Sequence, residues 1–199
     1  GSYTALIDTP EIKVASISPE LFFQKGDFRG KNNVIVSKPM KGTMPRGQTS
    51  DEDKILFNKL KHSNKDRAEN VMIVDLLRND IARISQSGTV NVYKPFMIEC
   101  YNTVFQMTSM VTGQLESETK LINIFNALFP CGSITGAPKL STMKYIEQLE
   151  SSPRSIYCGT IGMLLPEGRM VFNIPIRTIE YRNQCAIYGV GAGITIDSI

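Results

Sequence analysis

Apolar residues recur at helical spacing along four stretches of the chain. The spacing predicts helices over residues 50–63, 66–84, 121–128 and 138–149. The first begins at Ser50-x-x-Asp53, which has the form of a capping box, and directs Leu56, Phe57 and Leu60 inward. Each predicted helix is therefore one that must bury an apolar side against other parts of the chain.

Runs rich in Val, Ile, Phe and Thr, bounded by turn residues, predict strands between these helices. The predicted strands are residues 13–24, 33–39, 90–97, 103–115, 156–165, 170–181 and 186–190. Residues 38–47 contain two prolines and two glycines and are expected to be irregular. Strands and helices come in runs rather than in strict alternation, which predicts an α+β fold with antiparallel sheets.

The predicted helix 66–84 carries both apolar and charged residues. Its middle, residues 71–74, is apolar on every side and is expected to be buried. The segment also holds four charged residues: Glu69, Asp75, Arg78 and Asp80. Asp75 and Arg78 are spaced to neutralise each other. Glu69 is either a ligand for a metal or the partner of Lys65 or Arg67.

Composition and charge exclude several classes of protein. The 199 residues carry a net charge of +3 without any basic block, so nucleic acid is not an expected partner. The longest apolar run is too short to span a bilayer, and membrane association is not expected. Four scattered cysteines indicate reduced thiols in the cytoplasm. The one histidine, His62, lies at the polar end of a predicted helix, so a Ser-His or Cys-His nucleophile is not expected.

Residues 129–139 form the most informative loop of the chain. Small residues and hydroxyls lie between two predicted helices, with Pro138 suited to the first helical position. Backbone N–H groups at a helix N-terminus, together with the charge of Lys139, suit a carboxylate or a phosphate. A capped helix start after a tight loop is the alternative.

Three further features suggest anion binding. Gly191 and Gly193 follow a strand, but Ile194 stands where a dinucleotide fingerprint needs its third glycine, so a backbone nest for an anion remains. Arg177 ends an apolar strand and could clamp a carboxylate, or lie on the surface of an edge strand. Lys41, between proline, methionine and glycine, is either a turn lysine or a desolvated nucleophilic amine.

Taken together, these motifs resemble the chorismate-utilising enzymes, a family that includes anthranilate synthase component I, aminodeoxychorismate synthase component I and the more distant isochorismate and salicylate synthases. The resemblance runs in order through Ser18-Pro-Glu-Leu-Phe22, Lys41-Gly-Thr43, Arg67-Ala-Glu-Asn-Val-Met-Ile-Val-Asp-Leu-Leu-Arg-Asn-Asp80, Gly132-Ser-Ile-Thr-Gly-Ala-Pro-Lys139, Tyr157-Cys-Gly-Thr-Ile-Gly162, Ile176-Arg-Thr178 and Gly191-Ala-Gly-Ile-Thr-Ile-Asp-Ser198. It implies antiparallel sheets packed as a sandwich with helices outside. Because family members are longer, it also implies that residues 1–199 are part of a single chorismate-binding catalytic domain, truncated at both ends.

The resemblance also implies the members of the site. Glu69 would be one ligand of Mg²⁺, and the metal would hold the ring carboxylate of chorismate. A second metal-binding glutamate would lie beyond Ile199, so these residues alone are expected to be inactive. The residues expected to contact the substrate are Gly42, Thr43, Thr135, Gly136, Lys139, Tyr157, Arg177, Gly191, Ala192 and Gly193, with Arg177 and the glycine nest on the enolpyruvyl carboxylate.

Within the family, Lys41 favours the aminodeoxychorismate synthase branch, which serves para-aminobenzoate and folate biosynthesis. The resemblance implies that Lys41 attacks the ring and that Glu20 acts as a base, while a glutamine amidotransferase supplies ammonia. Gln106 stands where many relatives have a histidine. Anthranilate synthase is the alternative enzyme, and a non-catalytic chorismate-binding module is the alternative without chemistry.

Overall fold

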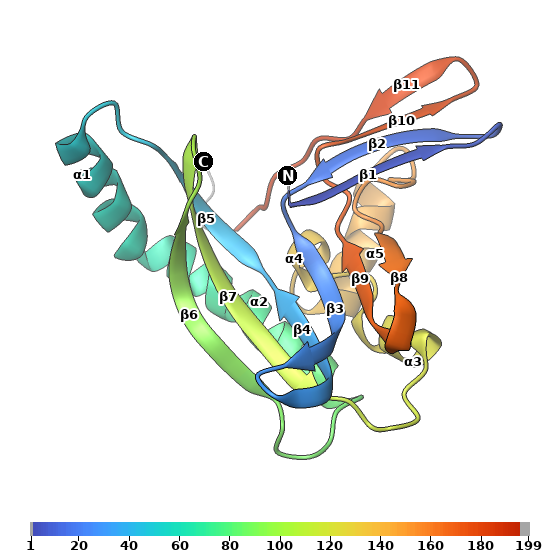
Figure 1. Ribbon diagram of the computed structural model, residues 1–199. Coiled ribbons are helices and arrows are strands. Elements are labelled where there is room, and N and C mark those ends of the chain that lie inside the picture. Colours follow the sequence, from blue (N-terminus) through green and yellow to red (C-terminus); the bar gives the residue numbers. More distant parts are fainter. Residues whose placement is uncertain (1, 196–199) are drawn as a thin grey trace.

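The structure, a computed structural model, describes residues 2–195 and shows an α+β fold with two antiparallel sheets (Figure 1). The larger, seven-stranded sheet has the order β5-β7-β4-β3-β9-β8, with β6 also paired to β7. Its strands are β3 (Leu21–Phe28), β4 (Lys31–Lys38), β5 (Met40–Pro45), β6 (Asn91–Cys100), β7 (Val104–Gln114), β8 (Ile161–Leu164) and β9 (Met170–Asn173). The predicted fold class and strand direction are confirmed.

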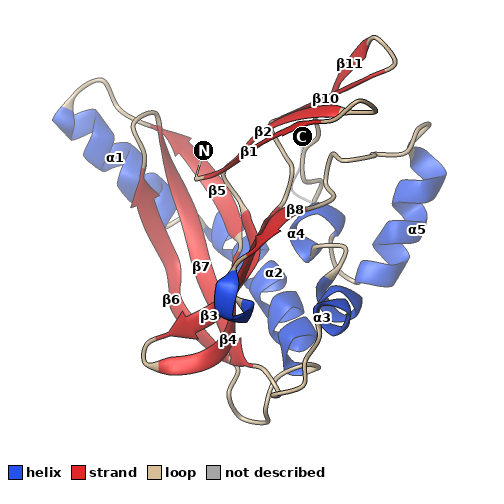
Figure 2. Cartoon of the chain, turned by 45° about the vertical axis from the view of Figure 1, so that its right-hand side comes forward, coloured by secondary structure: helices blue, strands red, loops and turns tan. Residues whose placement is uncertain are grey.

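The smaller sheet has four strands in the order β1-β2-β10-β11. They are β1 (Tyr3–Asp8), β2 (Lys13–Ser18), β10 (Thr178–Arg182) and β11 (Cys185–Tyr188). Figures 1 and 2 show this sheet projecting away from the larger one.

Two pairs of strands pass from one sheet to the other at the same place. The chain leaves β2 for β3 at Pro19 and Glu20, and leaves β9 for β10 through residues 174–177. The Ser18 hydroxyl donates to the carbonyl of Ile174 at 2.6 Å, and the amide of Ile174 donates to the carbonyl of Glu20 at 3.2 Å. This junction explains why the predicted strands 13–24 and 170–181 are each broken in two.

Proline and glycine did not prevent a strand in residues 38–47, so the prediction of an irregular segment was wrong. The strand β5 pairs with the same edge of β7 as β4 does, because the registers run on from Ser37↔Val111 to Met40↔Thr108. Pro39 lies between the two strands. Its carbonyl still accepts a hydrogen bond from the amide of Ser109 at 3.2 Å, so the proline does not interrupt the pairing with β7.

The helices lie on one side of the larger sheet (Figure 2). They are α1 (Ser50–Lys61), α2 (Asn64–Ala82), α3 (Leu121–Leu128), α4 (Gly132–Thr135) and α5 (Lys139–Leu149), with a 3-10 turn at η1 (Pro166–Gly168). The main core joins α2 and α3 to the sheet through Phe22, Phe23, Ile35, Leu77, Val111 and Ile124. No helix among residues 2–195 has the length and apolar character needed to cross a membrane.

The ends of the helices differ from the predictions by at most two residues. The N-cap of α1 is Thr49 rather than Ser50, and its hydroxyl accepts from the amide of Glu52. Pro138 is the N-cap residue of α5, and Lys139 is the first helical residue. The exposed position of His62 just after α1 is confirmed.

The helix α2 is amphipathic, so the prediction that residues 71–74 are buried on all sides was wrong. Ile73 is 1% exposed, whereas Val71 is 43% and Met72 is 38% exposed. The predicted pairing of Asp75 with Arg78 is confirmed at 3.0 Å, on the exposed side. The helix α5 has no buried residue, so its apolar positions do not contribute to the core.

Truncation of a core residue of α2 should separate its two sides. Leu77 is fully buried, so Leu77→Ala is expected to lower the free energy of unfolding by about 2–5 kcal/mol, through lost burial and the cavity left behind. Val71→Ala, on the exposed side of the same helix, should change it by less than about 0.5 kcal/mol. Urea denaturation followed by circular dichroism measures both. Equal losses in the two variants would contradict the observed helix orientation.

Candidate functional site

Lys41 lies on a β-bulge in β5. The register against β7 passes from Met40↔Thr108 to Thr43↔Gln106, so β5 has one more residue than β7 between these pairs. A bulge of this kind turns a side chain out of the regular alternation of the strand. The Lys41 side chain is half-buried, and its Nζ donates to the carbonyl of Ser133 in α4 at 3.2 Å. The lysine therefore points from the sheet towards the loop at 129–139.

Glu20 lies beside this lysine, at the junction of the two sheets. It is 5% exposed, and burial raises the pKa of its carboxyl to about 7 against the opposing effects of the Ser133 hydroxyl and the Lys41 ammonium. Its Oε1 atom is buried and has no hydrogen-bond partner among residues 2–195. A buried carboxyl with a free oxygen and a pKa near neutrality can both donate and accept a proton at physiological pH.

The glycines at the end of the described chain approach the same lysine. A Cβ atom added to Gly193 would lie 3.7 Å from Lys41 Nζ. A Cβ added to Gly191 would lie 2.7 Å from the Tyr157 hydroxyl oxygen, so that Tyr157 would have to move to admit any other residue. Tyr157 thus packs directly on the backbone of this segment. The predicted contacts Lys41, Gly191, Gly193 and Tyr157 come together in the structure, with Ala192 between the two glycines.

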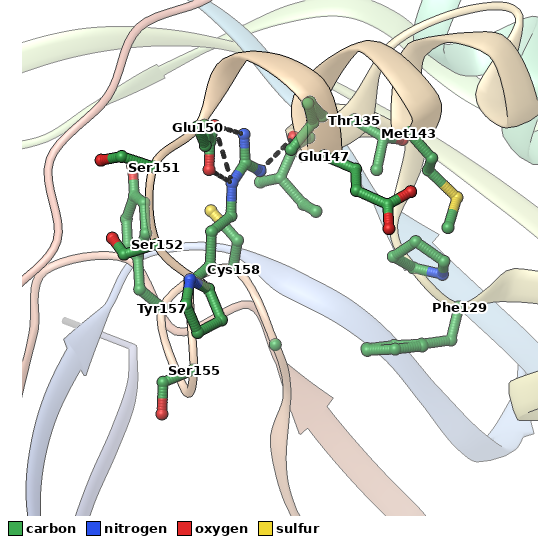
Figure 3. Close-up of a pocket in the computed structure, with 16 residues that line it drawn as sticks. Phe129, Thr135, Met143, Glu147, Glu150, Ser151, Ser152, Ser155, Tyr157 and Cys158 are labelled. Carbon is green, nitrogen blue, oxygen red and sulfur yellow. Dashed lines mark hydrogen bonds and ion pairs between the residues drawn. The ribbon is translucent and has the colours of Figure 1, made fainter.

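Tyr157 and Thr135 also line a cavity of about 530 Å³ between α5 and residues 150–159 (Figure 3). Arg154 crosses this region, with two nitrogens on the Glu150 carboxylate and Nη1 donating to the carbonyl of Ile134 at 2.9 Å. It joins the Tyr157 loop to α4. Thr135 and Tyr157 line the cavity, whereas Lys41 and Glu20 do not.

Glu69 lies on a row of α2 that faces the site. Asp66, one turn earlier, packs under Gly42, where an added Cβ would be 2.8 Å from the Asp66 Cβ. Leu76, two turns later, packs under Gly132 of α4. The helical repeat places Glu69 on the same side of α2 as these residues, between β5 and α4. It is half-buried and makes no hydrogen bond or ion pair with any residue from 2 to 195 whose contacts are described.

Lys139 is already paired. Its Nζ lies 2.6 Å from Asp80 Oδ2 and 3.1 Å from the Leu128 carbonyl, and both side chains of the ion pair are largely buried. Burial raises the pKa of Asp80, and the neighbouring Lys139 opposes that rise. This ion pair anchors α5 to α2. Because the Asp80 carboxylate neutralises the Lys139 ammonium, the ammonium attracts an outside anion only weakly. Gly136, also predicted to contact the substrate, ends α4.

Arg177 lies at the junction of the sheets rather than on a strand. Its carbonyl accepts from the amide of Ile17 at 3.1 Å, and its side chain is exposed. The guanidinium makes no ion pair with the acidic residues of the described chain, 2–195. A free arginine at this position remains available to a carboxylate.

Two residues in the site were missed by the residue patterns. The carbonyl of Ser133 accepts a hydrogen bond from Lys41 Nζ, and the Ser133 hydroxyl lowers the pKa of Glu20. Gln106 contacts both Gly42 and Thr43. No periodicity singles out either residue, because both roles depend on strands and helices that are distant in sequence.

The chain is similar to known proteins along its whole length. The model of the chorismate binding enzyme family matches residues 1–199. Aminodeoxychorismate synthase component 1 of Bacillus subtilis is 42% identical over 197 residues, which cover 99% of this chain and 41% of that protein. Anthranilate synthase component 1 of Aquifex aeolicus is 39% identical over 197 residues, covering 99% and 39%. The chain thus spans about two fifths of the length of these relatives.

Solved structures agree with the fold. Anthranilate synthase component I of Streptococcus pneumoniae superposes with a TM-score of 0.87 at 36% identity, covering 100% of this chain and 42% of that one. The menaquinone-specific isochorismate synthase MenF of Escherichia coli gives a TM-score of 0.74 at 18% identity, covering 87% and 38%. The second likeness concerns the fold alone.

The raised pKa of Glu20 predicts a pH-dependent stability. The folded carboxyl, with a pKa of about 7, holds its proton more tightly than an ordinary one at 4.5, so its contribution to stability is lost as the pH rises between these values. Glu20→Gln removes this loss. The stability of the variant relative to the parent should increase from about pH 4.5 to about pH 7 by about 3 kcal/mol and then level off. Urea denaturation across this range measures it, and a constant difference would mean an ordinary carboxyl.

Proposed function

The chain belongs to the family of chorismate binding enzymes, and on this premise we propose that it is part of the catalytic domain of an aminodeoxychorismate synthase component 1. The proposed reaction converts chorismate and ammonia to 4-amino-4-deoxychorismate. Support comes from several relatives of that name at about 40% identity over nearly the whole chain. Because the chain covers about two fifths of each, activity, substrate and partner are all proposals for the full-length protein.

The single observation that carries the proposal is the position of Lys41. A bulge directs its amine towards α4, beside a buried carboxyl of raised pKa. An amine acts as a nucleophile only when it has lost its proton, and a nearby base with a pKa near neutrality can accept that proton. The pair Lys41–Glu20 has this arrangement.

The proposed covalent step forms a bond between Lys41 Nζ and ring carbon C2 of chorismate. The ring double bonds shift, the bond from C4 to its hydroxyl breaks, and the hydroxyl leaves as water with a proton from the Glu20 carboxylic acid. In the second step, ammonia forms a bond to C4, the double bonds shift back, and the bond between C2 and Lys41 breaks. Glu20 takes up the proton that ammonia gives up, so both residues return to their initial states. Two displacements replace one difficult step.

The remaining predicted residues suit a substrate with two carboxylates. Arg177 and the backbone of residues 191–193 would hold the enolpyruvyl carboxylate. Tyr157, Gly42 and Thr43 would contact the ring from the sides of the loop and of β5, and Thr135 and Gly136 from α4. Since Lys139 is paired with Asp80, its part would be to hold α5 and the loop in place rather than to bind the substrate directly.

Magnesium is the proposed cofactor, with Glu69 as one ligand. A half-buried carboxylate that makes no ion pair within residues 2–195, on the side of α2 between β5 and α4, fits a hard cation that prefers oxygen ligands. Among residues 2–195 no group of three acidic, histidine or cysteine side chains could hold a metal, so further ligands would come from the substrate, water or the rest of the protein. When bound, the ion would neutralise the ring carboxylate.

The proposed partner is a glutamine amidotransferase subunit that supplies ammonia. The relatives' designation as component 1 supports the existence of a second component. The proposed setting is para-aminobenzoate and folate biosynthesis in the cytoplasm, where glutamine is available as the nitrogen source.

Anthranilate synthase is the second candidate function. It is favoured by the Aquifex aeolicus relative at 39% identity and by the Streptococcus pneumoniae structure with a TM-score of 0.87. The position of Lys41 supports the first function, because the proposed amination at C4 uses a covalent lysine. Chromatography of the product separates the two: anthranilate is aromatic and has lost the enolpyruvyl group, whereas 4-amino-4-deoxychorismate keeps it.

Mass spectrometry of the full-length protein tests the covalent step directly. With chorismate and without ammonia, we expect Lys41 to gain the mass of chorismate minus one water. Lys41→Ala should abolish the adduct and lower turnover at least about 100-fold, the size typical for loss of a catalytic group. Lys144→Ala, at an exposed lysine of α5, is the control and should behave as the parent. Unchanged turnover in Lys41→Ala would exclude the mechanism.

Removal of the Glu69 carboxylate tests the magnesium site. Glu69→Gln should weaken Mg²⁺ binding by at least the roughly 10–100-fold seen on loss of even an outer partner of a ligand. Isothermal titration with Mg²⁺ measures the affinity, and turnover at increasing Mg²⁺ gives a second readout. Asp75→Asn, an exposed carboxylate on the same helix, is the control. Equal affinities in both variants would remove Glu69 from the site.

A further inference from the structure

We propose that Gln106 is a positioning residue that fixes the bulge of β5 and thereby aims Lys41. The inference deepens the proposed function, because it concerns the same lysine. It starts from a requirement of the backbone: a bulge takes one residue out of the ladder, so that some of its polar groups need other partners. Between Met40↔Thr108 and Thr43↔Gln106, the residues without a ladder partner are Lys41 and Gly42.

The side chain of Gln106 supplies the missing partner. Its Nε2 donates to the carbonyl of Gly42 at 2.8 Å, and its Oε1 accepts from the hydroxyl of Thr43, also at 2.8 Å. A primary amide has a donor and an acceptor fixed in one plane, so it can bind both groups of the bulge at once. Gln106 is only 8% exposed, so water competes little for its amide, and both hydrogen bonds are stronger for it.

The bulge is also held from its other side. Gly42 has a φ of 88°, a left-handed conformation that suits glycine, and Asp66 of α2 packs against it so closely that a Cβ would be 2.8 Å from the Asp66 Cβ. The Gly42 peptide therefore lies between α2 and the Gln106 amide. Without the amide, the peptide keeps one support and can rotate, and Lys41, one residue earlier, would move with it.

The direction of the second bond has a consequence for the substrate. Because the Thr43 hydroxyl donates its hydrogen to Gln106, its lone pairs remain free to accept a hydrogen bond. Thr43 is exposed on this side and would present an acceptor to a substrate hydroxyl. Gln106 thus sets both the aim of the nucleophile and the polarity of its neighbour, without touching the substrate.

The experiment compares Gln106→Met with the parent in the full-length protein. Methionine has nearly the same length and volume, but has neither the donor nor the strong acceptor. We expect kcat to fall about 10–100-fold, as for a catalytic group displaced by about 1 Å, with KM for chorismate nearly unchanged. Gln86→Met is the matched control, because it removes a hydrogen bond from a side-chain amide to the Leu115 carbonyl, far from the site. It should match the parent.

A second readout follows the lysine itself and does not need activity. Reductive methylation with formaldehyde and cyanoborohydride, followed by peptide mass spectrometry, gives the labelling rate of Lys41 relative to exposed Lys144 in the same sample. We expect this ratio to rise in Gln106→Met, because the amine leaves the Ser133 carbonyl. A raised ratio with lowered kcat supports positioning. An unchanged ratio overturns it, whether or not kcat falls.

The design separates this inference from the proposed function. If the parent protein does not convert chorismate, the proposed function fails, while the labelling ratio still decides whether Gln106 holds Lys41. If Gln106→Met does not fold, Gln106→Glu carries the test, because it keeps the acceptor for Thr43 and loses the donor to Gly42. It should raise the labelling ratio as well, and a ratio equal to that of the parent would overturn the proposal.

Discussion

Burial of the Glu20 carboxyl at the junction of the two sheets is the constraint on which the candidate site depends. Removing a carboxylate from water disfavours its charged form, and the structure offsets this only in part, through Lys41 and the Ser133 hydroxyl. The remaining imbalance is what brings the pKa near neutrality. The same junction holds Arg177, whose carbonyl accepts from the amide of Ile17 while its side chain is exposed.

The helix α2 gives this space its second wall. At successive turns it supports Gly42 through Asp66, Gly132 through Leu76 and the start of α5 through the ion pair of Asp80 with Lys139. Next to these residues on the buried side of α2, Ile73, Leu77 and Ile81 pack into the core. Because one rigid helix contacts β5, α4 and α5, any shift of the core would move the nucleophile and the loop together.

Much of the architecture could be predicted from the chain. The helical periods of residues 50–63 and 66–84, the strand pattern of residues 103–115 and the antiparallel class all correspond to observed elements. The errors have a common physical origin. Residues 13–24 and 170–181 have strand propensity throughout, but each is bent at the junction by contacts with the other. Residues 38–47 look irregular by composition, yet pairing with β7 outweighs the preferences of proline and glycine.

By itself, the sequence marked the candidate residues: Lys41, Glu20, Glu69, Tyr157 and the glycines of residues 191–193 all lie within its motifs. Only the tertiary structure decided what each of them contacts. Lys139, which looks like an anion site at a helix start, is neutralised by Asp80, and the Gln106 amide donates to the carbonyl of Gly42 in the bulge. The physical reason is that charge and hydrogen bonding act over a few ångströms in space, and those neighbours lie 59 and 64 residues apart in the chain.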